Sequence, residues 1–255
     1  MTDVLVRERR GSVLIARLNR PEVRNALNTA LMGQIGLALL EAEQDPAVRA
    51  VVLTGTGDRA FCAGMDLAEF ATGREGAGGA GMDRFRRFLD GAPGVPVIGA
   101  ATATAVAGGM ELLLACDLVV VSSEAKLGLP EVKRSLIPGG GGTFLGTRIP
   151  LALAMEIVLT GDSIDAERAY QMGLVNAVVA ADQVLDTALA LAERIAANGP
   201  LAVAAAKELV RLSIEDHARA RGRLGELVGS VFASDDAKEG ALAFVEKRTP
   251  TWTGK

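Results

Sequence analysis

Histidine, cysteine and aromatic side chains are scarce in this sequence, and each shortage excludes a class of site. His217 is the only histidine and lies in the polar stretch SIEDHARAR, so neither a Ser-His-Asp hydrolase nor a site with several histidine ligands is expected. Cys62 and Cys116 are the only cysteines, and their spacing matches neither a zinc site nor a disulfide scaffold. We therefore expect two buried free thiols in a reducing compartment and no bound metal.

Long apolar runs and an excess of basic residues are also missing. No stretch reaches the roughly 18 apolar residues of a membrane span, and the first residues lack the continuous apolar segment of a secretory signal. The net charge of −4 argues against a nucleic-acid partner, which would need a clustered basic surface. Arg74, Arg84, Arg86 and Arg87 lie among acidic residues, so we expect a solvated helix face there. The prediction is a cytoplasmic protein without nucleic-acid or membrane partners.

Short apolar segments alternate with helical patterns through about the first 145 residues, which is typical of an α/β fold. Residues 4–9 and 13–19 predict a hairpin that turns at Gly11, and Asn28 is placed to cap the helix that follows. Residues 50–57, 95–106 and 118–129 each predict one strand. From Thr143 onward the pattern is mainly helical. We expect an α/β core over residues 1–195 and a helical region for subunit packing over residues 196–255.

The stretch Gly76–Gly81 matches the G-x-G-x-x-G pattern of dinucleotide-binding turns. No strand precedes it, and that turn needs a strand to direct the next helix at the pyrophosphate. We therefore predict a mobile loop near the site rather than a nucleotide-binding turn.

Two glycine-containing segments could each present an unpaired main-chain N–H. One is the Ala63–Gly64 pair in FCAGMDL, where the chain turns sharply, and the other is Gly108–Gly109, where a strand ends and a helix begins. The first N–H groups of a helix lack partners within it, and the helix dipole makes that end positive, so a developing oxyanion would be stabilised there. The residues alone equally allow glycines that only permit tight turns.

Glu111 and Glu131 are the candidate acid and base. Glu111 follows Gly108 by three residues, so it projects from the same helix face, among apolar neighbours. Glu131 follows Pro130, and Pro-Glu is also a common opening of a helix. Each glutamate taken alone has an ordinary structural explanation.

Several motifs in one order identify a protein family more specifically than either glutamate alone. In chain order they are LNRPEVRNALN, FCAGMDL, AVAGGMELLLACDLVV, LGLPEVKRSLIPGGGGT, LTGDSIDAERAYQMGLVN and AFVEKR. Through them the chain resembles the crotonase, or enoyl-CoA hydratase/isomerase, superfamily along nearly its whole length. The resemblance implies an α/β fold, a crotonase-like spiral of ββα units with a C-terminal helical trimerisation region, and a homotrimer or dimer of trimers.

The resemblance also implies roles for individual residues. The N–H groups of Met65 and Gly108 would form the oxyanion hole of a thioester carbonyl, Glu111 and Glu131 would be the catalytic carboxylates, and the N–H of Gly139 would help hold the reacting water. Residues similar to those that contact coenzyme A in the family are Val23, Arg24, Ala26, Ala63, Gly64, Asp66, Leu67, Phe244 and Lys247. The last two often come from a neighbouring subunit.

The implied activity is that of an enoyl-CoA hydratase, a hydro-lyase of fatty acid metabolism or β-oxidation that adds water reversibly to an α,β-unsaturated acyl-CoA. Coenzyme A would be part of the substrate, with no other cofactor. Two carboxylates around one water can remove its proton and deliver a proton to carbon. Alternatives are a dehydratase such as carnitinyl-CoA dehydratase, a double-bond isomerase, which typically lacks one of the two glutamates, and a non-catalytic acyl-CoA-binding member. Many hydratases carry a smaller residue in place of Met65, which points to a narrower acyl pocket or a specialised substrate.

Overall fold

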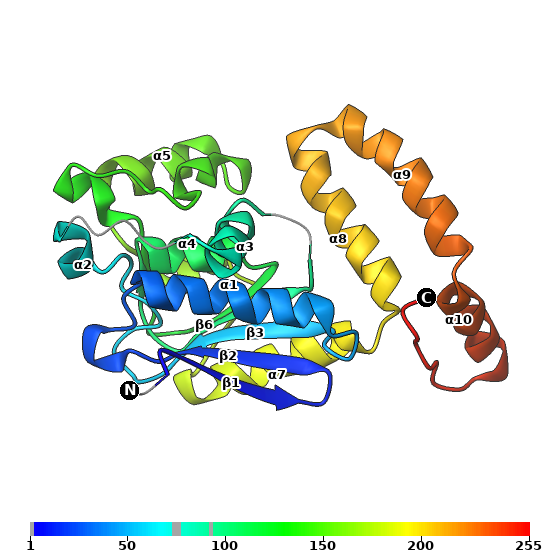
Figure 1. The fold of residues 1–255 in the computed structure, drawn as a ribbon. Coiled ribbons are helices and arrows are strands. Elements are labelled where there is room, and N and C mark those ends of the chain that lie inside the picture. The colour runs from blue at the N-terminus through cyan, green and yellow to red at the C-terminus, as the bar shows by residue number, and fades with distance from the viewer. Residues whose placement is uncertain (1–2, 73–77, 92–93) are drawn as a thin grey trace.

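The computed structural model describes residues 3–72, 78–91 and 94–255 (Figure 1). The predicted hairpin is present: β1 (Leu5–Arg10) pairs antiparallel with β2 (Val13–Leu18). Gly11 turns the chain between them with a φ of 57°, a conformation that glycine adopts without steric cost.

Parallel strands extend this hairpin into a six-stranded sheet of order β1-β2-β3-β4-β6-β9. The added strands are β3 (Ala50–Gly55), β4 (Val97–Ala101), β6 (Leu118–Ser122) and β9 (Ala177–Val179). β3 and β4 are buried at every position, as strands covered on both faces must be. Helix α7 (Val184–Ala196) packs on one face, against side chains such as Val52. The opposite face packs on α1, α3 and α4 (Figure 1).

The predictions of one strand each over residues 95–106 and 118–129 were wrong. Each segment forms two strands, because the chain leaves the large sheet and enters a second one of order β5-β7-β8. Its strands are β5 (Ala105–Val106), β7 (Lys126–Gly128) and β8 (Ile164–Asp165). β5 and β7 run parallel, and the N–H of Ala107 donates to the carbonyl of Gly128 at 2.9 Å. This pairing brings the chain before Gly108 beside the chain before Glu131.

Helix α1 (Thr29–Gln44) begins as predicted, with the Asn28 side chain accepting from the N–H of Leu31 at 2.9 Å. It packs closely on α3 (Ala80–Leu89), where a Cβ added to Gly81 would lie 2.4 Å from the carbonyl oxygen of Gly33. The loop prediction for Gly76–Gly81 was therefore wrong at its end, where the last two residues start α3; Gly76 and Ala77 lie outside the described residues.

The prediction of a solvated face for the arginine cluster was wrong for Arg84, which is only 2% exposed. Its guanidinium forms an ion pair with Glu43 of α1, a residue 41 positions earlier in the chain. Arg86 and Arg87 are exposed as expected, and Arg74 lies outside the described residues. Cys62 and Cys116 are buried free thiols, and burial raises the pKa of each to about 12.

The last third of the chain is helical apart from β8 and β9. Helices α5 (Leu151–Thr160) and α6 (Ala166–Gln171) lie on the core, whereas α8 (Pro200–Glu215), α9 (His217–Phe232) and α10 (Asp235–Glu246) project from it (Figure 1). The final residues return to the base of α8, where the indole N–H of Trp252 donates to the carbonyl of Ala197 at 2.8 Å. In the described part of the chain, no helix is both long and apolar enough to cross a membrane.

Candidate active site

Gly64 and Gly108 lie against each other at the centre of the candidate site. A Cβ added to Gly64 would lie 3.1 Å from the nitrogen of Gly108, and the φ of Gly64, 92°, also favours glycine. The residue before Gly108 is Ala107, a non-glycine residue with a φ of 52° and a ψ of −130°. Such backbone strain is often concentrated at functional sites. The close approach brings Gly64, the residue before Met65, against the first residue of the helix that begins at Gly108.

The two N–H groups predicted to form an oxyanion hole are available. Gly108 is the first residue of α4 (Gly108–Ala115), where an N–H has no partner within the helix. Among the described residues, neither the Met65 nor the Gly108 N–H donates a main-chain hydrogen bond. Met65 pairs with Leu27 in an isolated parallel bridge, through the carbonyl of Gly64 and the N–H of Asp66.

Glu111 lies one helical turn from the Gly108 N–H and is only 6% exposed. Its Oε1 accepts hydrogen bonds from the N–H groups of Gly140, at 2.6 Å, and Gly142, at 3.0 Å. These two donors replace water around the buried carboxylate and fix its direction. In the same glycine run, the N–H of Gly139 was predicted to help hold the reacting water; Gly139 is exposed, and this role stays a prediction. The run PGGGG was the available signal for the Gly140 and Gly142 donors, since residues without a Cβ let the main chain approach a side chain closely.

Glu131 is the second residue of the short 3₁₀-helix η2 (Pro130–Arg134), which follows β7. Its Oε2 is buried and has no hydrogen-bond partner among the described residues. Burial raises the pKa of Glu131; its own main-chain N–H partly opposes the shift, and the charge of Glu111 adds to it. The structure thus brings the two predicted carboxylates together and gives them different environments.

A small cavity of about 370 Å³ lies beside the same loops. Arg24, Arg59, Ala60, Ala63, Thr104 and Val106 line it. Arg24 and Ala63 were predicted to contact coenzyme A, whereas Arg59 was not, because only the fold brings it beside Arg24. Val23, Met65 and Leu67 are exposed apolar residues of the adjoining surface, and Ala26 lies in the segment between Val23 and Leu27. Two arginines at a cavity are suited to phosphate groups.

Phe244 and Lys247 do not join this site within one chain. They lie at the end of α10, on the opposite side of the molecule from α2 (Leu67–Ala71) and α4 (Figure 1). Phe244 is 84% exposed.

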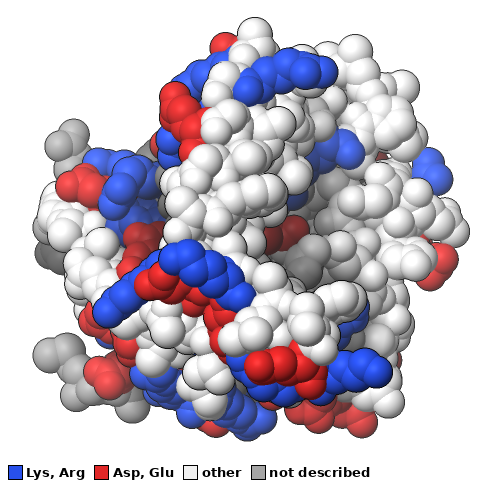
Figure 2. All heavy atoms as spheres, turned by 90° about the vertical axis from the view of Figure 1, so that its right-hand side faces the viewer, with Lys and Arg blue, Asp and Glu red and all other residues white. Residues whose placement is uncertain are grey.

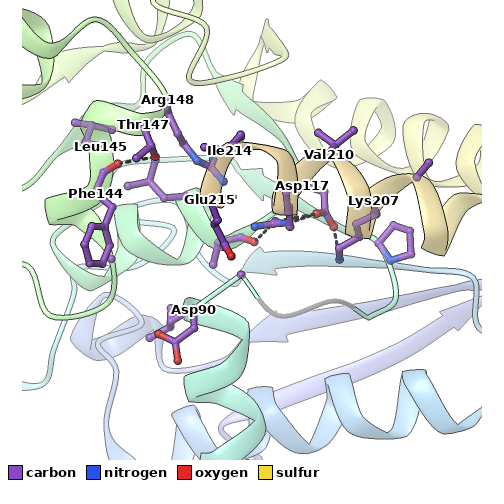
Figure 3. A pocket seen from close by; sticks show the side chains of 18 of the residues that line it. Asp90, Asp117, Phe144, Leu145, Thr147, Arg148, Lys207, Val210, Ile214 and Glu215 are labelled. Atoms are coloured by element: carbon purple, nitrogen blue, oxygen red, sulfur yellow. Dashed lines mark hydrogen bonds and ion pairs between the residues drawn. The ribbon is translucent and has the colours of Figure 1, made fainter. Parts of the chain in front are cut away.

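A larger groove of about 840 Å³ separates α8 from the core (Figure 3). It reaches Gly140 and Gly141, next to the N–H that holds Glu111. Phe144 and Leu145 line its core side, and Val210 and Ile214 of α8 line the opposite side (Figure 3). Within its wall Asp117 pairs with Lys207, at 2.7 Å, and with Arg211, at 2.8 Å. The groove is thus mainly apolar, with one carboxylate held between two cations in its wall.

A mainly parallel α/β core, two available N–H groups on adjoining segments and two nearby carboxylates define an enzyme site suited to an oxyanion formed next to a proton transfer. The comparison with known proteins gives the family: residues 8–255 match the model described as enoyl-CoA hydratase/isomerase, and the chain belongs to this family. The predicted crotonase resemblance is confirmed, as is the α/β fold with a C-terminal helical region, whereas the role of that region in trimerisation stays a prediction.

Relatives cover nearly the whole chain. An enoyl-CoA hydratase of Mycobacterium tuberculosis, EchA19, is 42% identical over 260 residues, which are 99% of this chain and 97% of the relative. A carnitinyl-CoA dehydratase of Proteus mirabilis is 39% identical over 258 residues, 96% of this chain and 97% of the relative. A crystal structure of an enoyl-CoA hydratase from Mycobacterium tuberculosis H37Rv superimposes with a TM-score of 0.90 at 43% identity, covering 99% of this chain and 100% of that one.

Proposed function

We propose that this protein is an enoyl-CoA hydratase, a hydro-lyase that adds water reversibly across the double bond of an α,β-unsaturated acyl-CoA thioester. The family and the hydratase relatives agree with this activity. The observation that carries the assignment to this site is the pair Glu111 and Glu131, two carboxylates in different environments beside two available N–H groups.

In this mechanism the N–H groups of Met65 and Gly108 bind the thioester oxygen, where negative charge develops as water attacks the β-carbon. Glu111, held by Gly140 and Gly142, takes the proton of the water. Glu131, whose pKa is raised, gives a proton to the α-carbon. Two carboxyl groups of opposite protonation state thus complete hydration, and the reverse steps dehydrate the product.

In this proposal the coenzyme A moiety binds in the small cavity, with Arg24 and Arg59 near its phosphates. The segments Val23–Ala26 and Ala63–Leu67 would lie along the coenzyme A moiety. Phe244 and Lys247 would come from a second copy of the chain, in a trimer or a dimer of trimers built through the region of residues 196–255. Exposed apolar side chains of the projecting helices, such as Phe232 and Val245, support this assembly. Figure 2 shows the face with these helices, where uncharged side chains form continuous areas.

We propose that the acyl chain binds in the large groove, because that groove starts at the loop that holds Glu111 and has mainly apolar walls. Its volume lies within the usual range for small-molecule sites, roughly 300–1,000 Å³. A dehydratase acting on a carnitinyl-type thioester is the second candidate, since such a relative matches 96% of the chain. Asp90 and Glu215 line the same groove and would face a cationic acyl group (Figure 3).

A substrate screen separates these assignments. Purified protein is mixed with crotonyl-, longer enoyl-, branched enoyl- and crotonobetainyl-CoA, and loss of the enoyl-thioester absorbance is followed. We expect hydration of the uncharged thioesters, with unchanged rates after EDTA treatment. Preference for crotonobetainyl-CoA would favour the second candidate, and double-bond migration without hydration would contradict both.

A further inference from the structure

Asp66 directly follows Met65, and a carboxylate so close to an oxyanion hole opposes the negative charge that forms there. In the structure this carboxylate is paired: Oδ2 accepts a hydrogen bond from Nη2 of Arg20 at 2.9 Å. Both side chains are only 15% exposed, so solvent screens the pair much less than it would at the surface. The sequence suggested Asp66 as a coenzyme A contact, which stays a prediction; within the chain its side chain is engaged with Arg20.

The guanidinium of Arg20 makes a second contact that joins two segments of the site. Its Nη1 donates to the carbonyl of Ala26 at 2.5 Å, while Nη2 holds Asp66. One arginine therefore ties the chain before Leu27 to the chain after Met65, the two residues that form the isolated bridge. Burial raises the pKa of Asp66, but the hydrogen bond from Arg20 and the N–H of Glu69 outweigh it and hold the pKa below its usual value.

The bridge sets the direction of the Met65 N–H. The N–H of Leu27 donates to the carbonyl of Gly64 at 2.7 Å, and the N–H of Asp66 donates to the carbonyl of Leu27 at 2.9 Å. Since successive N–H groups of an extended chain point to opposite sides, the Met65 N–H points away from Leu27. The segment after Met65 is held in this arrangement by the second of these hydrogen bonds, which a displacement of Asp66 would weaken.

The main chain of Arg20 is itself fixed to the core through Asn25. The N–H of Arg20 donates to Oδ1 of Asn25 at 2.9 Å, and Asn25 is fully buried, with a φ of 55°. Nδ2 of Asn25 donates in turn to the carbonyls of Thr56 and Ala60. The main chain of Arg20 is thus held rigidly, as a residue that positions another group requires.

We propose that the Arg20–Asp66 pair is a positioning device of the oxyanion hole: it fixes the direction of the Met65 N–H and cancels the negative charge of the neighbouring carboxylate. Arg20 and Asp66 act through Met65 rather than on the substrate. This inference rests on the proposed function, because it assumes that a thioester oxygen binds the Met65 N–H.

The test uses three variants of the full-length protein. Arg20→Gln leaves the carboxylate uncompensated. Asp66→Asn removes that charge but retains a side-chain oxygen to accept from the N–H groups of Ala68 and Glu69, which Oδ1 of Asp66 caps at 3.2 and 3.3 Å. The double variant removes both charges. Arg7→Gln is the control, since Arg7 of β1 pairs with Glu41 of α1 at 2.6 Å, an ion pair that involves neither the segment of Met65 nor that of Leu27.

The first measurement is the kinetics of crotonyl-CoA hydration. Arg20→Gln is expected to lower kcat about tenfold, less than the roughly 10²–10³-fold cost of removing an oxyanion donor, with a smaller change in KM. The double variant is expected to recover part of the loss, and Arg7→Gln to match the wild type. Equal losses in Arg20→Gln and the double variant would contradict charge compensation.

The second measurement is the infrared carbonyl stretch of bound butyryl-CoA, a saturated thioester that cannot be hydrated. Binding to the wild type should lower the frequency of the carbonyl stretch, and Arg20→Gln should make that decrease smaller. A role of Arg20 in overall stability alone would leave the frequency unchanged. No shift in the wild type would contradict the oxyanion hole and the proposed function. A normal shift in both proteins, with unchanged kcat, would overturn the positioning role and leave the proposed function intact.

Discussion

The main-chain N–H of Gly140 lies 2.6 Å from Oε1 of Glu111, which is 29 residues earlier in the chain. A glycine is needed there, because an added Cβ would lie 2.9 Å from the other carboxylate oxygen, Oε2. The position of the candidate base therefore depends on a loop that carries no reactive side chain.

Gly140→Ala should push the Glu111 carboxylate away from the water it activates. We expect kcat to fall about tenfold or more, since small displacements of a catalytic group are costly, while coenzyme A affinity stays unchanged because Arg24 and Arg59 are untouched. The measurement is steady-state hydration of crotonyl-CoA together with coenzyme A binding by calorimetry. Gly33→Ala is the matched control, because a Cβ added to Gly33 meets nothing within 4 Å. An unaltered kcat in Gly140→Ala would contradict this account of the loop.

The raised pKa of Glu131 predicts the alkaline limb of the pH profile. Glu131 must be protonated to give a proton to carbon, so kcat/KM for hydration should fall as pH rises through its pKa. The charge of Glu111 contributes to the raised pKa, so Glu111→Gln should move this limb to lower pH in the residual activity. The measured limb belongs to the coupled pair. A limb that stays in place or moves to higher pH in Glu111→Gln would contradict the assignment.

Local patterns predicted much of the fold. The hairpin around Gly11 and the α1 cap at Asn28 depend on residues only a few positions apart, so the sequence contains the whole signal. The split of residues 95–106 into β4 and β5 was missed because β5 exists only by pairing with β7, about 20 residues later. Arg84 was expected in solvent for the same reason: its partner, Glu43, is 41 residues away.

The candidate site shows the same limit. Glu111 and Glu131 were selected through motifs, but their different environments arise from non-local contacts: the Gly140 and Gly142 N–H groups for the first, and burial near Glu111 for the second. Arg59 carried no sequence signal, because a lone surface arginine is common and only the fold places it beside Arg24.

Lys247 allows a test of whether two subunits contribute residues to one coenzyme A site. It follows α10, far from the site of its own chain (Figure 1), so a neighbouring chain must supply it if it binds coenzyme A. Lys247→Ala should raise KM about tenfold, the scale of a lost charged hydrogen bond. Co-expression with Glu111→Gln should restore a normal KM, because sites with an intact Glu111 then receive Lys247 from the partner chain. A KM that stays high in the mixed oligomer, or a monomer by light scattering at micromolar concentration, would contradict the shared site.

If the acyl chain binds in the large groove, residues that line the groove should limit the length of acyl chain that the enzyme accepts. Ala206 of α8 lines it, so Ala206→Trp should obstruct a long acyl chain while leaving the four-carbon crotonyl group free. We expect kcat/KM for dodecenoyl-CoA to fall about tenfold or more relative to crotonyl-CoA, the usual scale of overpacking. Ala204→Trp, on the same helix but outside the lining, is the control. Equal effects on both substrates would place the acyl chain elsewhere.

The last prediction concerns the two carboxylates and separates hydratase from isomerase chemistry. Glu111→Gln preserves an oxygen to accept from Gly140 and Gly142, so the fold should persist while the base is lost. Glu131→Gln removes the proton donor. Each should lower kcat about a hundredfold or more, the usual scale for a positioned acid or base, with little change in acyl-CoA affinity because the Met65 and Gly108 N–H groups remain.

The double variant should be only slightly worse than the worse single variant, since residues that act as a unit are strongly non-additive. An isomerase that used one base would behave differently, because one of the two glutamine variants would still shift a double bond at nearly the normal rate. Crotonyl-CoA hydration and double-bond migration are therefore measured on the same four proteins. If either single variant hydrated crotonyl-CoA at close to the wild-type rate, the two-glutamate mechanism would fail, while the family and fold would stand.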